Sequence, residues 1–204
     1  MNWKNPTPLL IQRLMGAQPG VPGLMVDALT KFFRANYGAT TLPKTVADFA
    51  IFDQLAANAV ILQYFQGAFT PARSNFPGGT FQLPQSEHAF ITGIKIYSGV
   101  NASVSASDWQ AGANDAALKN GVMDIVINGQ KVVTALPLSQ FGQAADSATF
   151  AGETDSERGI FYFYEPLVLL GQTQISVNVS FPTAPATANL NLRVEFFGVR
   201  FIGN

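Results

Sequence analysis

Residues 159–181 have the sequence GIFYFYEPLVLLGQTQISVNVSF, which contains two runs typical of β-strands. Residues 160–164 are β-branched or aromatic, and residues 175–181 alternate apolar side chains with Ser and Asn. This period of two predicts a strand with one buried face and one face in water. Pro166 lies between the two runs, and because it cannot donate to a sheet ladder we expect it at a bend or on an edge strand.

Four further segments have a strand-like composition: residues 59–65, 90–97, 122–135 and 190–202. Asn128-Gly129 divides the third of them, and this dipeptide favours the type I′ turn of a β-hairpin. Gly198 permits a kink or bulge in the last one. The 18 Gly and 12 Pro residues fit many turns between short strands. The sequence therefore predicts a mainly β protein, an antiparallel β-sandwich of jelly-roll type with a helical N-terminal extension.

We expect three parts: a docking arm over residues 1–23, a helical extension over residues 24–58 and the sandwich over residues 59–204. Residues 24–37 predict a helix because their apolar side chains share one side while Asp and Lys/Arg lie on the other. A second helix is predicted over residues 45–57, where Thr45 and Asp48 form an acidic variant of the capping box. These helices would form a small layer against one side of the sheet.

The arm is too apolar to remain in water and too short to build a core of its own. Two prolines and three glycines follow its apolar run and end it. It either folds back on its own domain or lies on a neighbouring subunit. The subunit-interface residues predicted on the second interpretation are Leu9, Leu10, Ile11, Leu14 and Met15.

The chain has 204 residues, of which only 12% are charged and 48% are hydrophobic, with a net charge of −1. So little charge suggests that part of the surface meets other protein. The basic residues are too few and too scattered for a nucleic-acid arm. There is no cysteine, which excludes disulfides and thiolate chemistry. No stretch reaches the roughly 18 apolar residues of a membrane-spanning helix.

Candidate catalytic and metal-binding residues are few. His88 is the only histidine, so a zinc site or a Ser-His-Asp triad has little support, and we expect His88 to be an ordinary residue at a strand start. Glu153, Asp155 and Glu157 could bind Ca²⁺, but a solvated loop is the simpler interpretation. Glu165 and Glu195 remain open as a glycosidase pair, since two acids on separate strands leave no motif. We therefore predict no cofactor, no metal and no catalytic residue.

The segments FYEPLVLL at 163–170 and LNLRVEFFGVRFIG at 190–203, with FQLPQSEHAFITGIKIYSG at 81–99, resemble the strands of jelly-roll capsid proteins of small tailless bacteriophages. The resemblance covers about residues 60–204. It implies a non-enzymatic virion subunit that self-assembles, with copies of itself and other virion proteins as partners. The N-terminal residues lack a signal-peptide pattern, so synthesis in the host cytoplasm is expected.

Two other functions stay open. The first is a carbohydrate-binding or lectin-like sandwich, in which Trp3 and Trp109 with the tyrosines stack on a sugar. The second is an enzyme on the same fold that uses Glu165, Glu195 or the acidic loop.

Overall fold

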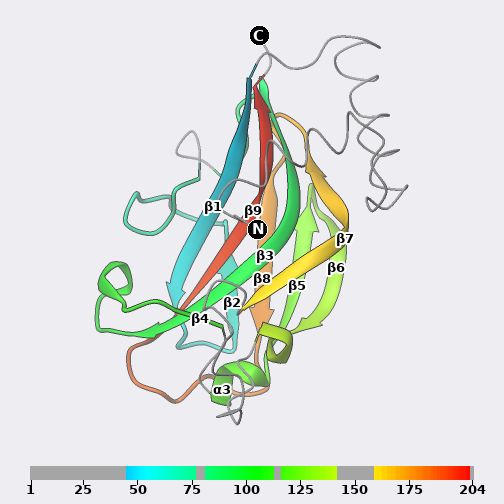
Figure 1. Ribbon diagram of the computed structural model, residues 1–204. Coiled ribbons are helices and arrows are strands. Elements are labelled where there is room, and N and C mark those ends of the chain that lie inside the picture. The colour runs from blue at the N-terminus through cyan, green and yellow to red at the C-terminus, as the bar shows by residue number, and fades with distance from the viewer. Residues whose placement is uncertain (1–44, 77–80, 113–115, 142–158, 203–204) are drawn as a thin grey trace, which may run out of the picture.

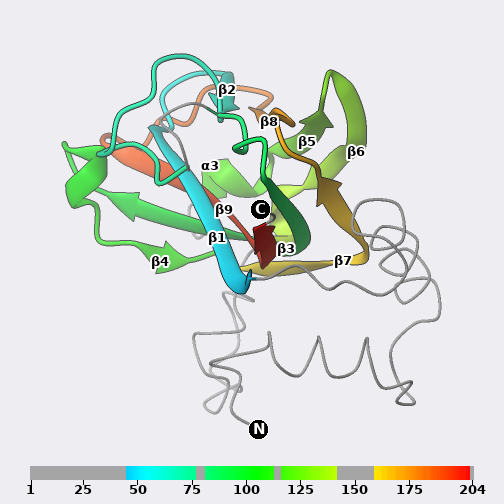
Figure 2. The same cartoon turned by 90° about the horizontal axis from the view of Figure 1, so that it is seen from above.

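The computed structural model describes residues 45–76, 81–112, 116–141 and 159–202, which are mainly β (Figure 1). The larger sheet contains β1 (Thr45–Ala56), β9 (Leu190–Ile202), β3 (Glu87–Val100), β4 (Gln110–Ala111) and β7 (Ile160–Leu169). The smaller sheet contains β2 (Ile61–Tyr64), β8 (Ile175–Ser180), β5 (Val122–Ile127) and β6 (Gln130–Pro137). All pairings are antiparallel, and the view from above separates the two sheets into facing layers (Figure 2). The predicted antiparallel sandwich is confirmed.

β3 and β9 are the centre of the larger sheet and pair with each other along almost their whole lengths. On the side away from β3, β9 pairs with β1. On the side away from β9, β3 pairs with β7 and with the two-residue strand β4. In the smaller sheet the order is β2-β8-β5-β6. The edges of the larger sheet, among the described strands, are therefore β1 on one side and β7 with β4 on the other.

The core lies between the two sheets and follows the alternation of the sequence. In β8, Ile175, Val177 and Val179 are fully buried while the intervening polar residues are half-buried. The inward side chains of β9 belong to the same core cluster. So do Phe65, Phe76 and Phe81, whose rings make edge-to-face contacts with centroids about 6 Å apart. The predicted period of two in residues 175–181 is thus confirmed.

The hairpin of β5 and β6 has the predicted turn, because Asn128 and Gly129 have φ angles of 49° and 79°. The ladder between β3 and β9 also has the bulge expected near Gly198. The extra residue of this bulge is Thr92, which lies on β3 and not on β9. Gly198 is needed for a different reason: a Cβ at this position would overlap the carbonyl oxygen of Phe90. Pro166 lies within β7, where the pairing with β3 is interrupted, and β7 is an edge strand as predicted.

The helix predicted over residues 45–57 is wrong, because this segment is β1 and pairs with β9 over twelve residues. Phe49, Ile51, Asp53 and Leu55 alternate toward the core, which is the period of a strand. The capping pattern of Thr45 and Asp48 is a local preference that pairing over a full strand overrides. β1 therefore belongs to the larger sheet rather than to a helical extension.

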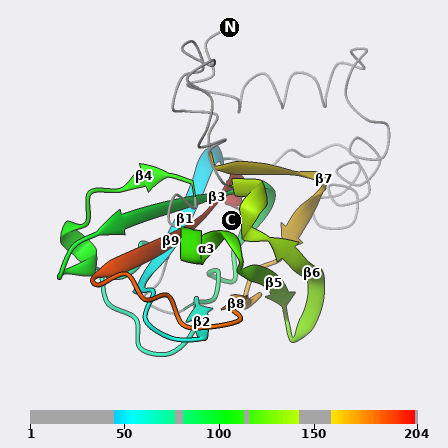
Figure 3. The ribbon, with the colours of Figure 1, turned by 90° about the horizontal axis from the view of Figure 1, so that it is seen from below.

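The long connection between β3 and β5 contains η2 (Val104–Ala106) and α3 (Ala116–Lys119). A view from below shows α3 at one end of the sandwich (Figure 3). A further turn, η3 (Leu138–Phe141), follows β6 and buries Leu138 and Phe141. The docking arm and the helix predicted over residues 24–37 lie outside the described residues.

Candidate functional site

Several residues selected from the sequence lie outside the described ranges: Leu9, Leu10, Ile11, Leu14, Met15, Trp3, Glu153, Asp155 and Glu157. Glu165 lies in β7 and Glu195 in β9, with β3 between these two strands. His88 lies in β3, where its Nδ1 accepts a hydrogen bond of 3.0 Å from the amide of Gly171, and burial lowers its pKa. This hydrogen bond links β3 to the turn after β7. His88 is thus an ordinary residue at the start of a strand, as predicted.

Charged and aromatic side chains lie together on the outer face of the larger sheet, and we call this group the arginine–aromatic cluster. Its centre is Arg193 of β9, whose guanidinium carbon lies 3.6 Å from the centroid of Phe52, 5.5 Å from that of Tyr97 and 6.0 Å from that of Trp109. Glu195 lies two residues along β9, with its Oε2 3.5 Å from an Arg193 nitrogen. The register places Lys95 of β3 opposite Glu195 and Tyr97 opposite Arg193.

Partial burial shifts the pKa values in this cluster. Burial raises the pKa of Tyr97 to about 12, and the charge of Glu195 adds to the rise. Burial also raises the pKa of Glu195, against the opposing effects of Arg193 and Lys95, and lowers the pKa of Arg193. These directions follow from the cost of placing charge in a poorly hydrated position.

The cluster is suited to stacking and hydrogen bonding more than to bond breaking. Arg193 has its face on Phe52, a contact worth about 0.5–1 kcal/mol at a partly exposed site. The Nε of Arg193 is buried and has no hydrogen-bond partner among the described atoms. The side chains of Arg193 and Glu195 are each about one-fifth exposed, so this part of the sheet keeps limited contact with water.

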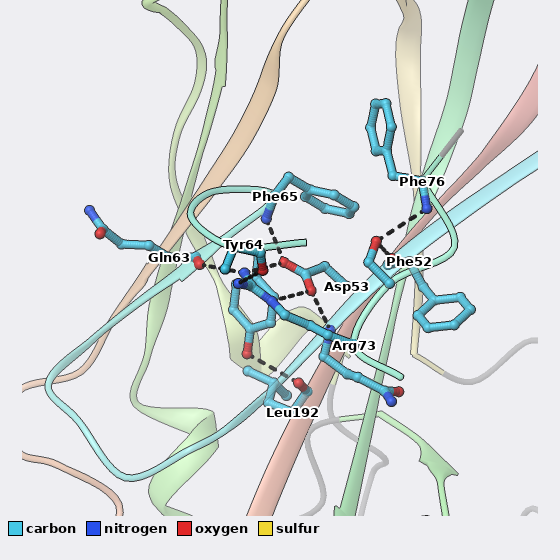
Figure 4. A network of polar contacts seen from close by, with 11 residues as sticks. Phe52, Asp53, Gln63, Tyr64, Phe65, Arg73, Phe76 and Leu192 are labelled. Atoms are coloured by element: carbon cyan, nitrogen blue, oxygen red, sulfur yellow. Dashed lines mark hydrogen bonds and ion pairs between the residues drawn. The ribbon is translucent and has the colours of Figure 1, made fainter. Parts of the chain in front are cut away.

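A buried ion pair joins Asp53 of β1 to Arg73 in the loop after β2 (Figure 4). The Oδ1 of Asp53 accepts hydrogen bonds from the Gln54 amide at 3.0 Å and Arg73 Nε at 2.8 Å. Its Oδ2 accepts from the Phe65 amide at 2.6 Å and from a terminal nitrogen of Arg73 at 2.7 Å. The carboxylate is 0% exposed, and burial raises its pKa while Arg73 and the two amides oppose the rise.

This network is structural. Arg73 also donates to the carbonyl oxygens of Ala68 and Gln63, so one guanidinium fixes the loop after β2 against β1. The sequence pattern does not single out Asp53, because residues 45–57 predict a helix. Its signal was available, since Asp53 takes an inward position in the alternation of Phe49, Ile51 and Leu55.

A third feature is an apolar strip on the outer face of β7 and the residue after it. We define the β7 strip as Tyr164, Val168 and Leu170, which are 70%, 36% and 44% exposed. They lie beside the edge of the larger sheet. Two of the three are aliphatic, on a protein with few charges to separate such surfaces.

The described residues offer little for other kinds of site. No group of three or more His, Cys, Asp or Glu residues that could hold a metal ion occurs in the described ranges. Within the same ranges, no helix has the length and apolar character needed to cross a membrane. No protein-family model matches the chain, and a comparison with curated protein sequences gives no match either.

Proposed function

We propose that the sandwich is a jelly roll and that the protein is a self-assembling structural subunit of a virion, such as a capsid protein. The strand pairing supports the first part. If the two-residue strand β4 is set aside, eight strands remain. The first of them pairs with the last, the second with the second-last, and so on: β1 with β9, β2 with β8, β3 with β7, and β5 with β6. One long antiparallel ribbon folded over on itself gives this order, and the fold is common among viral capsid and lectin domains.

The observation that carries the assembly proposal is the β7 strip. A row of exposed Tyr, Val and Leu beside a sheet edge is a surface that water-exposed monomers usually avoid. A second copy that packed on it would bury this apolar area and shield the backbone groups of β7. Stable contacts of this kind usually bury about 1,200 Å² or more in total, so the strip would form the centre of a wider interface. The low content of charged residues favours the same conclusion.

The test is the mass of the full-length protein in solution, measured by light scattering coupled to gel filtration across protein and salt concentrations. We expect particles well above the monomer mass of 21.9 kDa. A Tyr164→Ser/Leu170→Ser variant should shift the distribution toward the monomer. Electron microscopy of the largest species would then show whether the particles are closed shells.

Val132→Ser is the matched control, because Val132 is 45% exposed on β6 of the other sheet. It should leave the mass distribution unchanged. A wild-type protein that remains a monomer at high concentration would contradict the assembly proposal. Assembly of the Tyr164→Ser/Leu170→Ser variant to the wild-type extent would show that the strip is not the interface.

The N-terminal arm is a second proposed contact between copies. Deletion of residues 1–23 should leave the sandwich folded and remove assembly, if Leu9, Leu10, Ile11, Leu14 and Met15 dock on a neighbouring subunit. Normal assembly of the truncated chain would assign the contact to the sandwich alone. The two experiments are independent, since the arm and the β7 strip are altered separately.

The arginine–aromatic cluster favours one alternative function, the binding of a carbohydrate. Trp109 and Tyr97 supply ring faces, and Arg193, Glu195 and Lys95 supply polar groups beside them, which is the combination used to hold sugars. Binding of a glycan at this face should change tryptophan fluorescence, and Trp109→Ala should abolish the change. A protein that is monomeric and responds to a glycan would support this alternative over the virion subunit.

A further inference from the structure

One edge of the larger sheet is formed by a long and regular strand. β1 pairs with β9 over twelve residues without a register shift, so its other side carries a row of backbone N–H and C=O groups that β9 does not use. Such an edge is a template on which another chain can add a strand. Among the described edges, β1 is therefore the one that most needs protection against strand pairing between copies.

The other described edges are unsuited to strand addition. β2 and β4 are only four and two residues long. In β6, two register shifts interrupt the ladder with β5, and Ala135 has a φ angle of 53°. In β7, residues 163–166 have no partner in the ladder with β3, and Pro166 has no N–H to donate. Short strands, bulges and Pro are all means by which natural sheets block their edges.

A short segment after β2 lies along the free edge of β1, and we call residues 72–75 the edge strap. Ser74 pairs with Asp53 in an isolated antiparallel bridge. The amide of Gln54 donates a hydrogen bond of 3.2 Å to the carbonyl oxygen of Arg73. The edge strap thus occupies the position beside β1 that an added strand would take.

Two side chains of the edge strap complete this role. The Ser74 hydroxyl donates to the carbonyl oxygen of Phe52 at 2.5 Å. Asn75 Oδ1 accepts a hydrogen bond of 2.6 Å from the Phe52 amide, and Asn75 Nδ2 donates to the carbonyl oxygen of Ala50 at 3.0 Å. A side-chain amide has the same donor and acceptor as a peptide group. Asn75 therefore satisfies two edge groups that a strand of another chain would otherwise bind.

The other end of the edge strap is anchored to β1 by its own contacts. Arg73 forms the ion pair with the buried Asp53, and Gln54 Nε2 donates to the carbonyl oxygen of Ala72 at 2.7 Å. These contacts do not involve Asn75. Loss of the Asn75 side chain should therefore free the edge at Ala50 and Phe52 while the edge strap stays attached to a folded sandwich.

We propose that the edge strap is an autoinhibitory contact that prevents β1 of one copy from pairing with β1 of a second copy. Two identical strand edges can pair antiparallel about a two-fold axis, because each then offers the same groups to the other. With the edge closed, copies associate through side-chain surfaces and not through a sheet that continues from one copy to the next. The contact lies within one chain, so it does not depend on the proposed virion function.

The first measurement is hydrogen exchange at single amides of the full chain, at low protein concentration. Asn75→Val removes both amide hydrogen bonds, and we expect the Phe52 amide to exchange at least about tenfold faster than in the wild type. The Asp53 amide points toward β9 in the alternation of the strand, and its rate should not change if the sandwich remains folded. An unchanged rate at Phe52 would show that Asn75 does not close the edge.

A cross-link then reports whether the opened edge pairs. The chain has no cysteine and Ala50 is exposed on β1, so Ala50→Cys carries a single thiol beside the edge. Opposite residues of paired strands have Cβ atoms about 4.5–5.5 Å apart, within reach of a short bismaleimide. Ala50→Cys/Asn75→Val should give at least about fivefold more covalent dimer than Ala50→Cys, because two hydrogen bonds no longer close the edge.

Asn58→Val is the matched control, since Asn58 is an exposed Asn in the loop that follows β1. Ala50→Cys/Asn58→Val should give no more dimer than Ala50→Cys. A high yield of dimer from Ala50→Cys with the edge strap intact would show that the edge is open and would overturn the proposal. A yield that Asn75→Val leaves unchanged would overturn it as well. A wild-type protein that stays monomeric would contradict the proposed virion function and leave these expectations intact.

Discussion

Replacement of Arg73 by Met should destabilise the protein strongly and in a pH-dependent way. Arg73 makes two charge-assisted hydrogen bonds, at 2.7 and 2.8 Å, to a carboxylate that is 0% exposed. Met keeps much of the length of the side chain and removes its charge. Asp53 would then retain only the amides of Gln54 and Phe65 as donors. A buried charge whose partner has been removed typically costs about 3–5 kcal/mol.

Protonation of Asp53 limits this cost. A carboxyl group with an ordinary pKa of about 3.9 takes up a proton at a cost of about 4 kcal/mol at pH 7 and about 1.5 kcal/mol at pH 5. Burial already raises the pKa of Asp53, and loss of Arg73 raises it further. A raised pKa in the folded state means that stability is lost as the pH rises through it. We therefore expect Arg73→Met to cost about 3–4 kcal/mol at pH 7 and about 1–2 kcal/mol at pH 5.

The assay is urea unfolding of wild type and variant at both pH values, followed by circular dichroism. Lys131→Met is the control, since Lys131 pairs with Asp124 at a similar 2.6 Å but is 57% exposed, and surface pairs are worth roughly 0–1 kcal/mol. Asp53→Asn/Arg73→Met removes both charges and should recover part of the loss with no dependence on pH in this range. A cost of Arg73→Met below about 1 kcal/mol at pH 7, or one that is the same at pH 5, would refute the reasoning.

Three further predictions follow from single positions. Gly129→Val should lower stability by about 1–3 kcal/mol in urea unfolding, through backbone strain alone, because φ is 79° and an added Cβ meets nothing within 4 Å; Gly129→Asn should cost clearly less. Gly198→Ala should cost about 2–3 kcal/mol in the same assay, since its Cβ overlaps the Phe90 carbonyl oxygen, and wild-type stability would contradict this close approach. Tyr97 should ionise at a pKa of about 12 in an ultraviolet titration compared with Tyr97→Phe. Because this folded-state pKa is raised, the free energy of unfolding should fall as the pH rises above about 10. Ionisation of Tyr97 at a pH near 10 would count against the burial described for it.

The sequence predicted most of the strands because their signals are local. The alternation of residues 175–181, the Asn128-Gly129 turn and the edge position of Pro166 each depend on neighbouring residues, and all three are confirmed. The failure at residues 45–57 has the opposite cause. Thr45 and Asp48 favour a helix start locally, whereas pairing with β9, about 150 residues away, favours a strand.

The candidate surfaces could be predicted only in part. Trp109 and Glu195 were singled out from the sequence, but their place around Arg193 depends on three strands and a loop that come together only in the folded sheet. The partnership of Asp53 with Arg73 was not predictable for the same reason, since twenty residues separate them and no spacing rule connects a strand with a loop. The exposure of the β7 strip likewise depends on which strand is left at the edge.

The sequence by itself determined that this protein is mainly β, where its turns fall and which faces of its strands are apolar, because side-chain alternation and backbone preferences act over a few residues. Only the tertiary structure decided which strands pair, that β7 lies at an edge, and that Phe90 and Val199 are buried on the outer face. These properties arise from contacts between distant segments. An alternation of apolar and polar residues indicates that one face of a strand is apolar. Contacts in the folded protein then determine how that face is buried.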